Sequence, residues 1–225
     1  MSSLLENLLE EEAAREFPKL QKLTIVDFNS DSAMVTYTEL GGGLGKGALS
    51  VNNANPRAKW ERGSVVWGVR IASNPQPTFS CTDTRVVERL FASIVPELRS
   101  GEIRVMGIVR KAGMRTKIAV ASACEGLDPV AALVGRSHNR VDYVKDHLLG
   151  EQVDVVSYHP DPQIFLANAL QPAKVTDVAI DESKDIGFAK APSHQMAAAV
   201  GQQGLNSSLA AALIGISSVK ISPIK

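Results

Sequence analysis

Short runs of β-branched and apolar residues, separated by turn-forming residues, fill the chain between residues 23 and 84 and predict β-strands. The runs lie at residues 23–28, 33–38, 64–71 and 78–82. The glycine-rich stretch 40–49 suits either a flexible loop or a strand bent by glycine. Short strands at this density predict a small Greek-key barrel of the OB type.

The segment before the strands has a helical pattern. Leu4, Leu5, Leu8 and Leu9 recur on one face of a helix over residues 3–16, and glutamates crowd the other face. Pro18 ends this helix. A helix this short and charged is marginal alone, so we expect residues 1–17 to dock on their own domain or on a partner.

From residue 85 onward, helices and strands alternate, and one order occurs twice: helix, strand, strand, helix, glycine-centred loop, helix, strand. The sequences Ala-Leu-Val-Gly at 132–135 and Ala-Ala-Val-Gly at 198–201 set the register of the repeat. Asp128, Asp161 and Ser193 are expected to cap helices. This order is that of a type II KH domain, so we predict an α+β protein, with an N-terminal helix (1–17), an OB barrel (18–84), a first KH domain (85–158) and a second KH domain (159–225).

The composition of the chain limits which ligands the protein is expected to bind. Lysine plus arginine and aspartate plus glutamate each number 24, and aromatic residues make up 5%. A neutral chain does not bind phosphate indiscriminately, so RNA contact must come from a few placed groups. Cys81 and Cys124 have no metal-ligand spacing, and we expect no metal and no cofactor. No apolar run is long enough to span a membrane, so no membrane partner is expected.

The candidate RNA-binding groups are the two glycine-centred loops and their flanks. Glycine lets a nucleic-acid backbone approach closely, and the N-terminus of the following helix favours phosphate. KH domains clamp nucleotides in this way. Alternatives remain open: either loop is a structural cap, His138 is an exposed loop histidine that stacks on a base, and the strand pair Arg115 and Lys117 is a solvated sheet edge rather than a phosphate contact. The candidates are Arg115, Lys117, Gly135, Arg136, Ser137, His138, Arg140, Gly201, Gln202, Gln203, Gly204 and Asn206.

Two further features are weaker candidates. Tyr37, Trp60 and Trp67 are able to stack on bases, but such rings more often fill a small core. The run 41–47 superficially resembles a phosphate-binding loop, but it lacks the Ser or Thr that follows the lysine of such loops. No other catalytic pattern is present in the sequence, so we do not expect an enzyme.

The stretch from Leu90 to Lys225 resembles the bacterial transcription factor family NusA across its paired KH region. The resemblance rests on Leu90-Phe91, Val95-Pro96-Glu97, Arg115 to Val120, Asp128-Pro129-Val130, Leu149-Gly150-Glu151, Val153 to Val156, Ala167 to Leu170, Pro172 to Val175, and Gly201 to Asn206 with Leu209-Ala210-Ala211. It implies an OB barrel of the ribosomal protein S-one kind, followed by two KH domains that form one RNA-binding surface.

The resemblance also implies function and partners. It implies an RNA-binding accessory factor that contacts RNA polymerase and single-stranded nascent transcript and modulates elongation, pausing, termination or antitermination. The family's N-terminal polymerase-binding domain has no counterpart in the sequence, so we expect a divergent member, in the bacterial cytoplasm or in an organelle such as the plastid stroma. The alternative is a degenerate module that serves as a structural subunit of a polymerase or ribosomal assembly.

Overall fold

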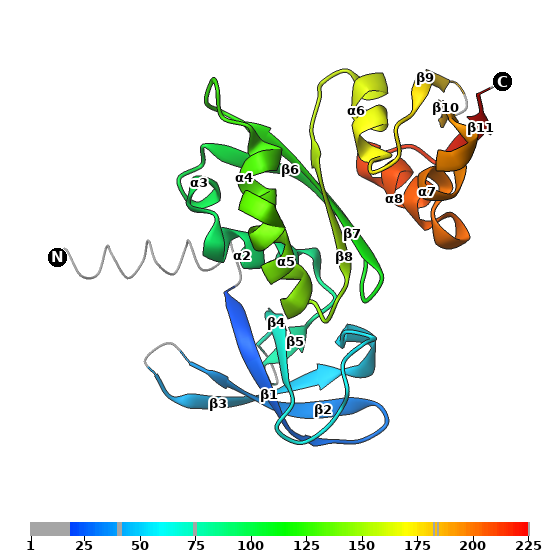
Figure 1. The fold of residues 1–225 in the computed structure, drawn as a ribbon. Helices are drawn as coiled ribbons and strands as arrows, with labels where there is room; N and C mark the ends of the chain where they lie inside the picture. The colour runs from blue at the N-terminus through cyan, green and yellow to red at the C-terminus, as the bar shows by residue number, and fades with distance from the viewer. Residues whose placement is uncertain (1–18, 40–41, 74–75, 182, 184, 225) are drawn as a thin grey trace. The chain divides into compact units, whose positions relative to one another are not determined.

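A computed structural model describes residues 19–39, 42–73, 76–181, 183 and 185–224. The helix expected at residues 3–16 lies outside this part of the chain. The described residues form two compact units (Figure 1). The first comprises the described residues up to Leu90 with His147–Leu149, and the second comprises Phe91–Asp146 and the described residues from Gly150 onward.

Within the described part of the first unit, five strands close into a barrel in the order β1-β2-β3-β5-β4. Strands β3 and β5 are parallel, while the other neighbours are antiparallel. This arrangement confirms the predicted OB-like barrel. Its core includes Leu23, Ile25, Val35, Leu49 and Phe79. The elements are β1 Leu20–Phe28, β2 Ser32–Thr38, β3 Leu44–Ser50, the 3-10 turn η1 Val51–Asn53, β4 Val65–Ala72 and β5 Thr78–Ser80.

The glycine-rich stretch supplies a strand of this barrel, which is the second of the two predicted possibilities. A Cβ on Gly45 would lie 2.5 Å from Cζ of Tyr37, and a Cβ on Gly47 would lie 2.6 Å from Cε2 of Phe79. Both glycines therefore leave room for a core ring that crosses the strand. Their role is packing, so the superficial likeness to a phosphate loop has no structural counterpart in the described residues 42–47.

Two KH-type folds follow, each with the predicted order of elements. The first contains α2 Thr84–Ile94, α3 Pro96–Arg99, β6 Ile103–Lys111, β7 Arg115–Ser122, α4 Pro129–Val134, η2 Arg136–His138, α5 Asn139–His147 and β8 Gln152–Ser157. The second contains α6 Pro162–Ala169, β9 Thr176–Asp181, β10 Ile186–Ala191, η3 Ser193–Gln195, α7 Met196–Val200, η4 Gln202–Gly204, α8 Leu205–Ile214 and β11 Ser218–Pro223.

The two sheets share one topology. In the order β6-β7-β8 the first pair is antiparallel and the second is parallel, and β9-β10-β11 repeats this pattern. The parallel pairs also begin alike, with Arg115 opposite Gln152 and Ile186 opposite Ser218. The repeat inferred from the sequence is therefore a repeat in three dimensions.

Helix capping follows the sequence at two of the three expected positions. The Asp128 carboxylate accepts from the main-chain N–H groups of Val130 and Ala131, and Asp161 caps α6 in the same way. The prediction for Ser193 is wrong. Ser193 lies inside the turn η3, and α7 begins three residues later, at Met196.

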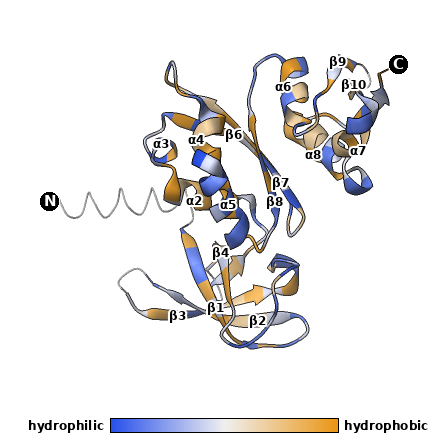
Figure 2. Cartoon of the chain, viewed as in Figure 1, coloured by the Kyte–Doolittle hydropathy of each residue, from blue (hydrophilic) through white to orange (hydrophobic). Residues whose placement is uncertain are grey.

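The second KH fold packs its helices against the sheet of the first. Phe165 of α6 contacts Ala119 of β7 and Val156 of β8, and Leu213 of α8 joins the same cluster. Gly107 of β6 permits this approach, because its Cβ position is 3.3 Å from Cδ1 of Leu213. Figure 2 shows the apolar character of α6 and α8 that suits this role. In the described part of the chain, no helix is long and apolar enough to span a membrane.

Candidate nucleic-acid interface

The two glycine-centred loops have nearly the same backbone. Gly135 has φ 76° and ψ 168°, and Gly201 has φ 78° and ψ 166°. Two positions later, Ser137 has φ 51° and ψ 33°, and Gln203 has φ 52° and ψ 30°. Each loop thus joins its two helices through the same sharp turn, although their side chains differ.

The first glycine of each loop is required by both backbone and space. Its φ lies in the left-handed region, which disfavours residues with a side chain. A Cβ on Gly135 would lie 2.8 Å from Cγ of Arg140, and a Cβ on Gly201 would lie 2.5 Å from the main-chain nitrogen of Asn206. The helix after the loop therefore packs directly on the glycine.

The fourth position of the loop is His138 in the first loop and Gly204 in the second, and the space around it explains why a histidine fits there. Gly204 has φ 75°, and the nearest atom to its Cβ position is Oγ of Ser207 at 3.9 Å, so a side chain has space there. His138 occupies the equivalent position with φ 65°. The His138 amide donates to Gly135 O at 3.2 Å, and the Gly204 amide donates to Gly201 O at 3.1 Å. The first loop keeps the turn and accepts about 1 kcal/mol of backbone strain.

Arg140 and Asn206, which follow the first glycine of each loop by five residues, hold the paired helices together. Arg140 Nη1 donates to the Ala132 carbonyl at 2.6 Å and lies 3.8 Å from the Glu97 carboxylate. Asn206 Nδ2 donates to the carbonyls of Ala199 and Leu170 at 2.9 and 3.0 Å.

The expected RNA contact at Asn206 is wrong, because its side chain is fully buried and serves this helix junction. Arg140 is partly exposed, and its contact with RNA stays a prediction.

The loop tips carry the exposed groups. Arg136, Ser137 and His138 are exposed in the first loop, and Gln202 and Gln203 are exposed in the second. Among the described residues, the Arg136 guanidinium has no ion-pair partner. Each loop leads into the N-terminus of a helix, α5 or α8, where unpaired N–H groups and the helix dipole favour an anion. The first loop can therefore offer a cation to phosphate, and the second offers only neutral donors.

Arg115 and Lys117 share one face of β7, as predicted, but this strand is the central one of its sheet and not a solvated edge. Lys117 is fully buried, with Nζ 2.8 Å from the Asp154 carboxylate and 2.8 Å from the Gln171 carbonyl. Burial lowers the pKa of Lys117, and Asp154 opposes that effect. The predicted phosphate contact at Lys117 is wrong. Arg115 pairs through two nitrogens with Asp154, at 2.6 and 2.9 Å, and its RNA contact stays a prediction.

A second buried ion pair, between Arg110 and Glu151, was not among the residues predicted from the sequence. Two guanidinium nitrogens lie 2.8 and 2.9 Å from the carboxylate, and both side chains are at most 1% exposed. Glu151 also accepts from the Gly113 amide at 2.8 Å and from the Thr116 hydroxyl. It thereby attaches the β6–β7 turn to the start of β8. A charged residue directly before an apolar strand was the only signal available.

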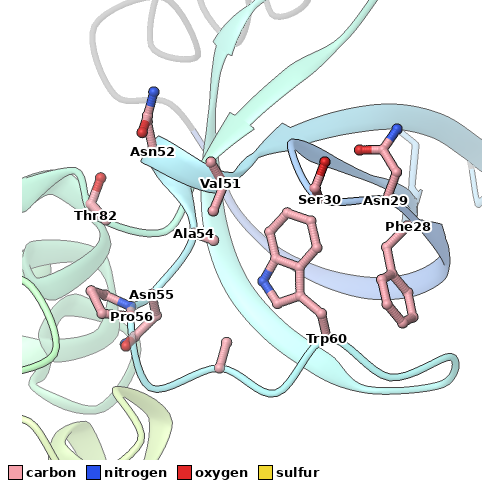
Figure 3. Close-up of a pocket in the computed structure, with 11 residues that line it drawn as sticks. Phe28, Asn29, Ser30, Val51, Asn52, Ala54, Asn55, Pro56, Trp60 and Thr82 are labelled. Carbon is pink, nitrogen blue, oxygen red and sulfur yellow. The ribbon is translucent and has the colours of Figure 1, made fainter.

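The three aromatic candidates have different positions in the barrel. Tyr37 is a core residue, with its ring centroid 4.9 Å from that of Phe79, as the preferred interpretation predicted. Trp67 is half-buried on β4. Trp60 packs against the core from outside and faces a surface hollow (Figure 3).

Comparison with known proteins places the paired folds in a family. Residues 81–158 match the model of the NusA-like first KH domain, and residues 162–222 match that of the NusA-like second KH domain. Both matches include one of the two loops. Each therefore covers the region in which the structure reveals the shared turn.

Three bacterial relatives are named transcription termination/antitermination protein NusA. The protein of Mycobacterium tuberculosis is 37% identical over 176 residues, which cover 76% of this chain and 51% of that protein. The Bacillus subtilis protein is 37% identical over 65% of this chain and 39% of its own length. The Thermus thermophilus protein is 30% identical over 87% of this chain and 51% of its own. The chain spans about half or less of these relatives, and it belongs to the NusA family.

Proposed function

We propose that this protein binds single-stranded RNA through its two glycine-centred loops and acts as a transcription termination and antitermination factor. The observation that carries the proposal is the common backbone of the two loops, each open at its tip and each leading into a helix N-terminus. A chain of zero net charge needs placed groups of this kind to hold phosphate.

The two loops have unequal roles in this proposal. The first loop supplies Arg136 as the cation, together with His138, whose ring is exposed and able to stack on a base. The second loop supplies main-chain N–H groups and the amides of Gln202 and Gln203. Affinity then depends on salt mainly through the first loop, because only that loop releases counterions from phosphate.

Association with RNA polymerase and modulation of elongation and pausing belong to the same proposal, since NusA relatives carry transcription functions in their names. We place the protein with a bacterial-type transcription apparatus, in the bacterial cytoplasm or in a plastid stroma. A structural role within such an assembly is the second candidate, and zero net charge favours it. The structural role is favoured if this protein still captures RNA polymerase after ribonuclease treatment and has no affinity for RNA itself.

The test measures affinity of the whole chain for labelled single-stranded RNA by fluorescence anisotropy at several salt concentrations. Arg136→Ala should weaken binding several-fold and reduce the salt slope by about 1. The double change Gln202→Asp and Gln203→Asp should weaken binding about tenfold, since two carboxylates repel phosphate.

The matched control for the second loop is Gln163→Asp, which adds a carboxylate at the exposed N-terminal end of α6. It should leave affinity within about twofold of the parent. Unchanged affinity in both loop variants would contradict the proposed RNA-binding role.

A further inference from the structure

The OB-like barrel has a hollow of about 620 Å³ at the end where the β1–β2 turn and η1 lie (Figure 3). This volume falls within the range of small-molecule sites. None of its eleven lining residues is charged. An uncharged lining disfavours an ion or a phosphate as the occupant and suits a neutral, flat group.

Aromatic side chains form one wall of the hollow. The Trp60 and Phe28 rings meet edge to face, with centroids 6.3 Å apart and planes at 89°. Trp60 also packs against the barrel core, which anchors the indole, while Phe28 remains 44% exposed. Figure 3 shows the indole between Phe28 on one side and Val51 and Ala54 on the other. An anchored indole beside an open space is a ready stacking surface.

The rim of the hollow is held in shape before any ligand arrives. Asn29 Oδ1 accepts from the amides of Asp31 and Ser32, both at 2.8 Å, which fixes the β1–β2 turn. The Val51 amide donates to Asp31 O at 2.8 Å and ties η1 to that turn. A preformed rim reduces the entropy lost on binding.

Polar groups on this rim are available to a ligand. Among the described residues, the Asn52 amide and the Ser30 hydroxyl have no hydrogen-bond partner, and both residues are exposed. An amide supplies both donors and an acceptor, which is what the edge of a nucleobase requires. Lys59, next to Trp60 in the chain, is exposed and is able to neutralise a phosphate outside the uncharged lining.

The outer face of β2 and β3 does not offer the same chemistry. The outward positions of β2 and β3 include Met34, Thr36, Lys46 and Ala48, and none of the outward residues on these two fully described strands is aromatic. Stacking at this end of the barrel therefore depends on Trp60 and Phe28.

We propose that this hollow binds an unstacked RNA base, which stacks on Trp60 while Asn52 and Ser30 contact its polar edge. The inference rests on the proposed RNA-binding function and adds a site separate from the two KH loops. It requires no particular placement of the barrel relative to the KH pair, since a flexible single strand can reach both.

The test uses the whole chain with Trp67→Phe, so that Trp60 is the single remaining tryptophan. Single-stranded oligouridylate and oligoadenylate should quench Trp60 emission, and RNA carrying 5-bromouridine should crosslink within residues 51–60. Trp60→Leu should weaken RNA binding about tenfold. Asn52→Ala, a change at an exposed position, should weaken it several-fold without lowering the thermal midpoint.

Two outcomes would overturn the inference and leave the proposed function standing. In one, anisotropy detects RNA binding, but RNA does not change Trp60 emission, and the Trp60→Leu and Asn52→Ala variants bind RNA with the affinity of the parent. The other is quenching by a synthetic peptide of residues 1–17 with none by RNA, which would assign the hollow to a protein segment. Absence of any RNA binding by the whole chain would overturn the proposed function together with the inference. Quenching that persists in the Gln202→Asp, Gln203→Asp variant would support a site independent of the second loop.

Discussion

Nζ of Lys117 lies 2.8 Å from the main-chain carbonyl oxygen of Gln171, so a buried ammonium in the sheet of the first KH fold meets the C-terminal end of α6 in the second. The negative end of a helix dipole favours a cation at this point. Asp154 balances the charge from within the first sheet. The contact therefore joins the two KH folds through a charged group that does not reach solvent.

Replacing this lysine tests its structural role. Lys117→Met should lower the free energy of unfolding by about 3 kcal/mol, because Gln171 loses its donor and Asp154 keeps only Arg115. The salt slope of RNA binding should not change, since the ammonium does not face solvent. Urea unfolding and anisotropy check the two expectations. Lys220→Met, at an exposed strand position, is the control, and a slope reduced by about 1 in Lys117→Met would contradict the assignment.

The same lysine predicts a pH dependence. Burial lowers the pKa of Lys117 from its ordinary value of 10.5. Between the lowered pKa and pH 10.5, the unfolded chain therefore binds more protons at this site than the folded chain. The contribution of this site to folding stability therefore rises with pH, up to about pH 10.5. The difference in unfolding free energy between the parent and Lys117→Met should move in favour of the parent as pH rises. A difference that moves the other way would be inconsistent with the lowered pKa.

Substitutions at the glycines of the two loops, and at His138, should change stability by graded amounts. Gly201→Ala should cost several kcal/mol, because left-handed strain adds to a contact with the Asn206 backbone. Gly204→Ala should cost about 1 kcal/mol, because space is open and only the backbone is strained. His138→Gly should be neutral or stabilise by up to about 1 kcal/mol. Thermal unfolding ranks the three, and equal losses for Gly201→Ala and Gly204→Ala would refute the steric argument.

The buried pair Arg110 and Glu151 should be among the most sensitive positions of the first KH fold. Glu151→Gln removes the charge that balances a buried guanidinium and should cost about 3–5 kcal/mol. Glu125→Gln, the same change at an exposed position, should cost less than about 0.5 kcal/mol. Chemical denaturation compares them, and similar losses would mean that the pair adds little to stability.

The order of elements was predictable because local patterns carry it. The Asp-Pro caps, the glycines at positive φ and the apolar strand runs each act over a few residues. The repeat and the loops at 135–138 and 201–204 followed from the same signals. The likeness of the two loop backbones was not predictable, since the first loop has His138 at the position where the second has Gly204.

An α+β chain with an OB-like barrel, two KH folds and two loops suited to phosphate was predictable from the sequence, because propensity, capping and hydrophobic period are local properties. Which polar residues reach solvent became clear only from the packing of the folded chain. Lys117 and Asn206 are polar in sequence and buried in the fold. Lys117 lies between the sheet of the first KH fold and the end of α6 in the second, and Asn206 lies among the helices of the second KH fold. Whether a charged side chain meets RNA or another part of the protein depends on contacts between residues distant in the chain, such as Lys117 with Gln171.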